Sequence, residues 1–181
     1  DSCLVGSEMC IRDRDLVDQL ATKLLEKEWR LVTAESCTGG IISTAITDKP
    51  GASDIFERGF ITYSNQAKID MLDIDPVQLK THGAVSALIA ENMVQGALKQ
   101  SKANIAVSTT GIAGPGGGTD KKPVGLVYIG FGIKGGITQS SEHFFEGNRE
   151  AIRLQTLKQA LEHLLSIIPV SYTHLRAHET R

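Results

Sequence analysis

The 181-residue sequence is poor in cysteine and in aromatic residues, and it has no long hydrophobic run. Of its three cysteines, Cys3 and Cys10 lie near the first residue. Cys37 therefore has no partner in the remaining chain, and a disulfide framework is excluded. No apolar stretch approaches the roughly 20 residues that span a bilayer. Because no signal-peptide pattern is visible either, we expect a cytoplasmic protein without a membrane partner.

An excess of basic charge is also missing. The 19 Lys and Arg against 21 Asp and Glu give a net charge of −2, whereas a nucleic-acid-binding face is normally basic. We therefore predict no nucleic-acid partner. His82, His143 and His163 show no ligand spacing with a cysteine or a carboxylate cluster, so no metal site is predicted.

The two ends look foreign to the rest of the chain. Residues 1–14 and 170–181 fit neither a helical nor a strand pattern, and they resemble translated sequencing-adaptor fragments. We exclude both from the fold prediction, as one would a cloning scar. His174 and His178 are spaced like metal ligands, but they belong to the second of these segments. Residues 15–169 contain no internal repeat and no linker, so we predict one domain there, with a composition that suits an α/β fold.

A turn between a short strand and a helix carries the most informative residues. Residues 31–34 are β-prone, and apolar residues recur at helical spacing over residues 41–46. Such a turn directs its side chains and the free N–H groups of the helix into one cleft. Ser36 and Cys37 lie on it, and Thr38 is predicted to cap the helix.

A second helix is predicted to begin at Ser64, after a strand that starts near Ile55. Lys68 then lies in its first or second turn, where the helix dipole disfavours a cation. On the surface this would be an ordinary solvated lysine. In a cleft the dipole and burial would favour the neutral amine, which a general base requires.

Glycine is concentrated late in the chain. The strand predicted over residues 104–110 ends in two threonines and leads into the glycine-rich segment 111–118, which matches neither a Walker loop nor a dinucleotide fingerprint. Bare backbone at this point can approach an anion closely, although a flexible connector is the equally simple interpretation. A hairpin is predicted next, turning near residues 134–136. Long helices are predicted from Ser86 and from Asn148, and Arg149 lies in the first turn of the last one.

Six ordered segments resemble one family, the C-terminal domain of CinA, which also occurs alone as the nicotinamide-mononucleotide amidohydrolase PncC. The matching segments are ESCTGG (35–40), PGAS (50–53), YSNQAK (63–68), HGAVS (82–86), TTGIAGPGGG (109–118) and FEGNREAIR (145–153). Together they cover essentially residues 15–169. The resemblance implies a three-layer α/β/α sandwich with a mixed sheet, and often a homodimer. It also implies that nicotinamide mononucleotide, a small-molecule substrate, is hydrolysed to nicotinate mononucleotide and ammonia without a cofactor or a metal.

The positions of individual residues supply roles that fit this reaction. Ser36 would attack the carboxamide carbon, Lys68 would take its proton, and Tyr63 would relay that proton or steer the lysine. The N–H groups around Thr38, Gly39 and Gly40 would hold the oxyanion. The residues expected to hold the phosphate are Thr109, Thr110, Gly111, Gly114 and Arg149. Ser53 is expected to approach the same cleft as a reserve hydroxyl.

Two alternatives stay open at this point. Cys37 is intrinsically the stronger nucleophile, although adjacent residues on a turn usually point in different directions and the resemblance favours Ser36. The chain could also be a non-catalytic module, associated with competence, that binds a nucleotide or a partner protein.

Overall fold

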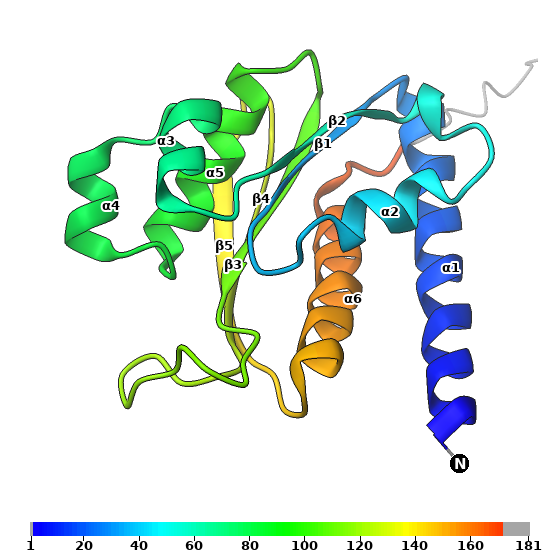
Figure 1. The fold of residues 1–181 in the computed structure, drawn as a ribbon. Coiled ribbons are helices and arrows are strands. Elements are labelled where there is room, and N and C mark those ends of the chain that lie inside the picture. Colours follow the sequence, from blue (N-terminus) through cyan, green and yellow to red (C-terminus); the bar gives the residue numbers. More distant parts are fainter. Residues whose placement is uncertain (1, 172–181) are drawn as a thin grey trace, which may run out of the picture.

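A five-stranded mixed sheet forms the centre of the molecule in the computed structural model, which describes residues 2–171 (Figure 1). The strands are β1 (Leu31–Glu35), β2 (Phe56–Ile61), β3 (Ile105–Gly111), β4 (Leu126–Ile133) and β5 (Thr138–Phe144), in the order β2-β1-β3-β4-β5. β1 runs parallel to β2 and β3, whereas β3, β4 and β5 pair antiparallel. The predicted α/β class and the predicted hairpin are both confirmed.

Helices cover both faces of this sheet. They are α1 (Ser2–Lys27), α2 (Ile41–Thr47), α3 (Asn65–Leu72), α4 (Pro76–His82), α5 (Ala87–Lys99) and α6 (Arg149–Ile167), with a short 3₁₀ helix η1 (Ala52–Asp54) before β2. In Figure 1, α1, α2 and α6 lie on one side of the sheet and α3, α4 and α5 on the other. This is the three-layer α/β/α sandwich expected from the resemblance.

The sheet separates two hydrophobic cores, and β1 contributes to both. Leu31 packs with α1, α2 and α6, whereas Val32 and Ala34 pack with α5 on the opposite face. Side chains alternate along a strand, and every residue of β1 is buried, including the polar Thr33 and Glu35. The turn that begins at Ser36 follows directly at the carboxyl end of this strand.

Polar side chains define where the helices begin. Ser64 accepts a hydrogen bond from the Ala67 N–H, Ser86 from the Ile89 N–H, and Asn148 from the Ala151 N–H. Each satisfies one of the free N–H groups in a first helical turn. The predicted starts at these three residues are therefore confirmed, and with them the places of Lys68 and Arg149 in their helices.

One prediction about the amino-terminal segment is wrong. Residues 2–14 were expected to form no regular element, but α1 begins at Ser2 and runs through them without interruption. Extending a formed helix adds one hydrogen bond per residue, and this segment contains no proline to stop it. Val17 and Leu20 anchor the helix in the core shared with α6. At the other end, residues 172–181, with His174 and His178, lie outside the described part of the chain.

Candidate active site

Ser36 is the first residue after β1, and its backbone is fixed by the neighbouring strand. Its N–H donates to the Thr109 carbonyl at 3.0 Å, so the pairing with β3 continues one residue beyond the strand. The chain then reverses through Gly39 and Gly40, whose φ angles of 58° and 106° lie in the left-handed region that favours glycine. The Gly39 N–H donates to the Ser36 carbonyl and closes the turn.

Lys68 reaches this turn from α3, on the other side of β1. Its Nζ lies 3.0 Å from Ser36 Oγ and 2.9 Å from the Thr62 carbonyl oxygen. The side chain is 1% exposed. Burial lowers the pKa of Lys68, because the protein interior solvates the ammonium less well than water does. Two residues that are 32 positions apart in sequence thus form one hydroxyl–amine pair.

Glu35 holds the start of α2 and was not singled out from the sequence. Its carboxylate is fully buried and accepts hydrogen bonds from the N–H groups of Ile42 and Ser43 and from the Ser43 hydroxyl. The prediction that Thr38 caps this helix is wrong, because Gly40 is the N-cap and makes no side-chain bond. The available signal was an acidic residue at the end of the strand that leads into the helix.

The Thr38 side chain points into the protein instead. Its hydroxyl bonds the Thr109 hydroxyl at 2.7 Å, and both residues are fully buried. Thr110 lies on the opposite face of β3 and donates to the Ala84 carbonyl at 2.7 Å. The two threonines at the end of β3 therefore do not share one face, and the structure brings only Thr109 to the turn that carries Ser36.

Cys37 belongs to the hydrophobic core. It is 7% exposed and packs among the apolar side chains of the α1–α2–α6 face. Burial raises the pKa of its thiol to about 12, since the thiolate would lose its hydration. The thiol therefore stays protonated at neutral pH, which removes the advantage that cysteine has as a nucleophile.

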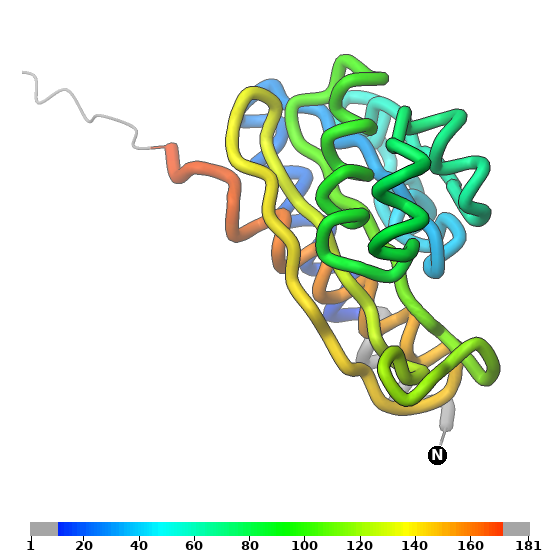
Figure 2. The backbone as a smooth tube through the Cα atoms, turned by 90° about the vertical axis from the view of Figure 1, so that its left-hand side faces the viewer, coloured from blue at the N-terminus to red at the C-terminus, as the bar shows by residue number. Residues whose placement is uncertain are grey.

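Arg149 joins three distant segments at the edge of the site. Its guanidinium donates to the Gly114 carbonyl and to the Tyr63 hydroxyl, each at 2.8 Å. Figures 1 and 2 both place the glycine-rich loop that follows β3 beside the start of α6. Tyr63 is 61% exposed, and the structure brings its hydroxyl to Arg149 rather than to Lys68.

Arg153, one turn further along α6, is a second cation that sequence reasoning missed. It donates from Nη2 to the Thr38 carbonyl at 2.8 Å, and its buried Nε has no hydrogen-bond partner in the described residues. Its spacing of four residues from Arg149 places both on one side of α6, which was the available signal. Arg153 therefore brings a positive charge to the turn that carries Ser36.

Ser53 does not lie with these residues, which corrects the expectation that it approaches the same cleft. It is exposed on η1, just before β2, whereas Ser36 follows β1. Because β1 and β2 are parallel, the two serines lie at opposite ends of the strands. The strand length of five residues corresponds to a separation of about 16 Å.

Backbone N–H groups remain available at the turn. Within the part of the chain that the structure describes, those of Thr38 and Gly40 donate no hydrogen bond.

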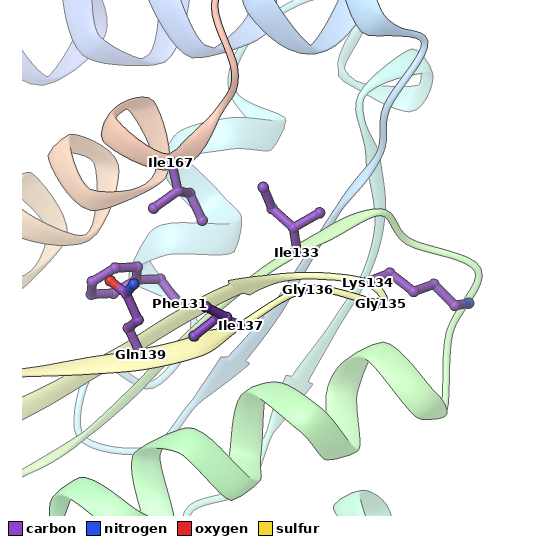
Figure 3. A pocket seen from close by; sticks show the side chains of 8 residues that line it. All are labelled: Phe131, Ile133, Lys134, Gly135, Gly136, Ile137, Gln139 and Ile167. Atoms are coloured by element: carbon purple, nitrogen blue, oxygen red, sulfur yellow. The ribbon is translucent and has the colours of Figure 1, made fainter.

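No three histidine, cysteine or carboxylate side chains of the described residues gather so that they could hold a metal ion. None of the helices in this part of the chain is long and apolar enough to cross a membrane. A hollow of about 500 Å³ lies elsewhere, at the β4–β5 turn (Figure 3).

Comparison with known proteins adds to this geometry. A model of the CinA C-terminal domain family matches residues 13–168. A relative in Caldicellulosiruptor bescii, named after competence-damage inducible proteins, is 51% identical over 150 residues, or 82% of this chain and 36% of the relative. The nicotinamide-nucleotide amidohydrolase PncC of Enterobacter agglomerans is 44% identical over 83% of this chain and 92% of its own length. The chain thus spans about a third of the first relative and most of the second.

Solved structures with the same fold carry similar names. The competence/damage inducible protein CihA of Agrobacterium tumefaciens superposes with a TM-score of 0.84 at 44% identity, covering 86% of this chain and 94% of that one. The competence damage-inducible protein A (ComA) of Klebsiella pneumoniae superposes with a TM-score of 0.82 at 32% identity, covering 86% and 96%.

Proposed function

Because the chain belongs to the CinA C-terminal domain family, we propose that it is an amidohydrolase that converts nicotinamide mononucleotide to nicotinate mononucleotide and ammonia. The observation that carries this proposal is the buried amine of Lys68, 3.0 Å from the Ser36 hydroxyl. The name of the relative PncC supports the substrate. In the same proposal the protein is a cytoplasmic homodimer that takes part in pyridine nucleotide salvage and NAD metabolism.

In the proposed acylation step, neutral Lys68 accepts the Ser36 hydroxyl proton while Oγ attacks the carboxamide carbon. The amine can be neutral because burial lowers its pKa. In this step one N–H group of the amine donates to the Thr62 carbonyl, and its lone pair faces the Ser36 hydroxyl. The N–H groups of Thr38 and Gly40 would stabilise the oxyanion of the tetrahedral intermediate, each donor lowering the barrier by about 3–4 kcal/mol.

Collapse of that intermediate breaks the C–N bond. The Lys68 ammonium returns its proton to the leaving nitrogen, ammonia departs, and an ester joins Ser36 to the nicotinoyl group. Water then attacks the ester with Lys68 again as the base, which frees the serine and releases nicotinate mononucleotide. One water is consumed for each ammonia released, so the steps use only the hydroxyl, the amine and the solvent.

The phosphate of the substrate is proposed to bind Arg149 and the glycine-rich loop at Gly111 and Gly114. A guanidinium can hold two phosphate oxygens at once, and bare backbone lets the anion approach the loop closely. Arg153 adds positive charge on the same side of α6. Tyr63 is assigned to positioning Arg149, because its hydroxyl bonds that guanidinium. Thr109 acts indirectly by fixing Thr38.

The decisive experiment measures ammonia release from nicotinamide mononucleotide by the purified chain. We expect turnover by the wild type and a loss of about 10²–10⁴-fold in kcat for Lys68→Met, which removes the base. Lys80→Met, an exposed lysine on α4, is the matched control and keeps the wild-type rate.

Two outcomes would contradict this proposal. Binding of the nucleotide by the wild type without any ammonia release would assign the chain to the non-catalytic binding modules. Activity retained in Ser36→Ala but abolished in Cys37→Ala would place the nucleophile on the sulfur atom instead.

A further inference from the structure

Two histidines and a serine form a compact cluster between β5 and α6, separated from β1 by the strands β3 and β4. The Nε2 atoms of His143 and His163 lie 3.3 Å apart. Ser141 Oγ lies 2.7 Å from each of them. Both imidazoles thus direct one nitrogen to the same point, which the small serine hydroxyl occupies. None of these residues takes part in the proposed amidohydrolase reaction.

Aromatic neighbours hold the two imidazoles in place. His163 stacks on Phe131 with ring centroids 4.4 Å apart and an interplanar angle of 8°. His143 stacks on Phe145 at 5.1 Å and 5°. The sequence has only five phenylalanines, and two of them serve this cluster. Each ring therefore has a fixed plane, which keeps the cost of ordering ligands low when an ion binds.

The distance between the two nitrogens matches a tetrahedral metal site. Zn²⁺ binds imidazole nitrogen at about 2.0–2.1 Å, so two such ligands at the tetrahedral angle lie about 3.3 Å from each other. Two imidazolium groups at this separation would repel, so at least one ring is neutral, which is the form that binds metals. We propose that His143 and His163 form a binding site for a divalent transition ion such as Zn²⁺, which displaces the Ser141 hydroxyl from the point between the two nitrogens and takes its remaining ligands from water.

The cluster is open to ions from solution. Both histidines are only half-buried. The hollow at the β4–β5 turn is lined by Phe131, on which His163 stacks, and by Ile167, one turn after His163 on α6 (Figure 3). Gln139, also in its lining, lies two residues before Ser141 and so on the same side of β5. Because His143 lies on β5 and His163 on α6, an ion bound between them would join the edge strand to that helix.

The simplest competing interpretation is a hydrogen-bonded chain without any ion. One imidazole N–H would donate to Ser141, and the serine hydroxyl would donate to the other imidazole. In that case the cluster binds Zn²⁺ no better than any exposed histidine does. The two interpretations therefore differ in a measurable affinity.

The test is calorimetric titration of the full chain with Zn²⁺. Because His174 and His178 could bind the ion themselves, all variants carry His174→Gln and His178→Gln. We expect one saturable site per chain, and a loss of affinity of at least about tenfold in His143→Gln and in His163→Gln. His82→Gln, an exposed histidine on α4, is the matched control and retains the affinity.

A second measurement separates lost ligands from lost folding. Zn²⁺ should shift the side-chain ¹⁵N signals of His143 and His163 and leave that of His82 unchanged. Both single variants should keep the amide spectrum of a folded protein. Absence of a saturable site, or wild-type affinity in either His143→Gln or His163→Gln, would overturn the proposal in favour of the hydrogen-bonded chain. Neither result depends on amidohydrolase activity.

Discussion

The buried amine of Lys68 works against the stability of the fold while serving the proposed chemistry. An ammonium that is removed from water loses its hydration, and its two hydrogen bonds replace only part of it. The usual compensation would be a carboxylate close to the amine, but the nearest polar partners are the Ser36 hydroxyl and the Thr62 carbonyl. A buried ionisable side chain whose pKa is shifted in this way is typical of active sites.

This cost makes stability depend on pH in a definite direction. The pKa of Lys68 is lowered in the folded state, so between that pKa and the unfolded value near 10.4 the unfolded chain binds more protons. We therefore expect the unfolding free energy of the wild type, relative to Lys68→Met, to rise as the pH increases through this window. Urea unfolding at pH 7 and pH 10 measures it. A constant difference would mean that the lysine is not destabilised by burial.

Catalysis should follow the same titration. The base must be neutral, so kcat/KM should increase with pH and level off above the lowered pKa of Lys68, which lies below the range of an exposed lysine. Initial rates of ammonia release between pH 6 and 10 test this. A rate that falls over the whole of that range would exclude a neutral lysine as the base.

Tyr63 could either position Arg149 or relay a proton, and the two roles predict different kinetics. Its hydroxyl bonds Arg149 at 2.8 Å, so Tyr63→Phe should raise KM for the nucleotide several-fold through a less ordered guanidinium and leave kcat close to the wild-type value. Steady-state kinetics on the wild type and on Tyr63→Phe provides the measurement. A fall in kcat at unchanged KM would instead support the proton relay considered from the sequence.

At the scale of elements, α3 carries Lys68, and its position depends on a close contact with α5. A Cβ added at Gly96 would overlap the Leu72 carbonyl oxygen at the end of α3. Alanine favours a helix over glycine by about 1 kcal/mol, but overpacking typically costs about 1–3 kcal/mol. Since the overlap involves backbone atoms that cannot rotate away, the steric cost of the added methyl group should exceed the gain in helix propensity.

We therefore expect Gly96→Ala to destabilise the protein by about 1–2 kcal/mol and to reduce turnover by moving Lys68 away from Ser36. Chemical unfolding and ammonia release measure the two effects. Gly116→Ala is the matched control for stability, because a Cβ there meets nothing within 4 Å. Equal stability of Gly96→Ala and Gly116→Ala would show that α3 and α5 can move apart to admit the extra methyl group at no cost in free energy.

The start of α2 depends on one side chain. Replacing Glu35 with alanine leaves the buried N–H of Ile42 and the partly buried N–H of Ser43 without an acceptor, which should lower the unfolding free energy by about 2–3 kcal/mol. Glu35→Gln keeps one acceptor and should lose less. Urea unfolding of both variants tests the order, with the exposed Glu26→Ala expected near the wild-type value.

At the scale of the whole molecule, one sheet contributes side chains to both hydrophobic cores. We therefore expect the two cores to unfold together. The single tryptophan, Trp29, packs against the α1–α2–α6 core. Its fluorescence and far-UV circular dichroism should therefore give the same unfolding midpoint. Two separated midpoints would mean that the faces of the sandwich unfold independently.

Local patterns in the sequence determined the elements and their order. Capping residues and apolar periodicity are properties of short segments, which is why the helix starts at Ser64, Ser86 and Asn148 and the strand–turn–helix at Ser36 followed from the sequence. The six motifs added the family. Three expectations failed: residues 2–14 belong to α1, the start of α2 is held by Glu35 instead of Thr38, and Ser53 lies before β2, at the end of the strands away from Ser36.

Only the tertiary structure decided which distant groups meet. Ser36 and Lys68 touch because parallel strands end at one edge of the sheet, and Cys37, beside Ser36 in sequence, is lost to the core by the geometry of the same turn. His143 and His163, which show no ligand spacing in the sequence, face each other because α6 packs against β4 and the hairpin sets the register of β5. Spacing along a chain describes one element at a time, whereas distance between elements depends on how they pack.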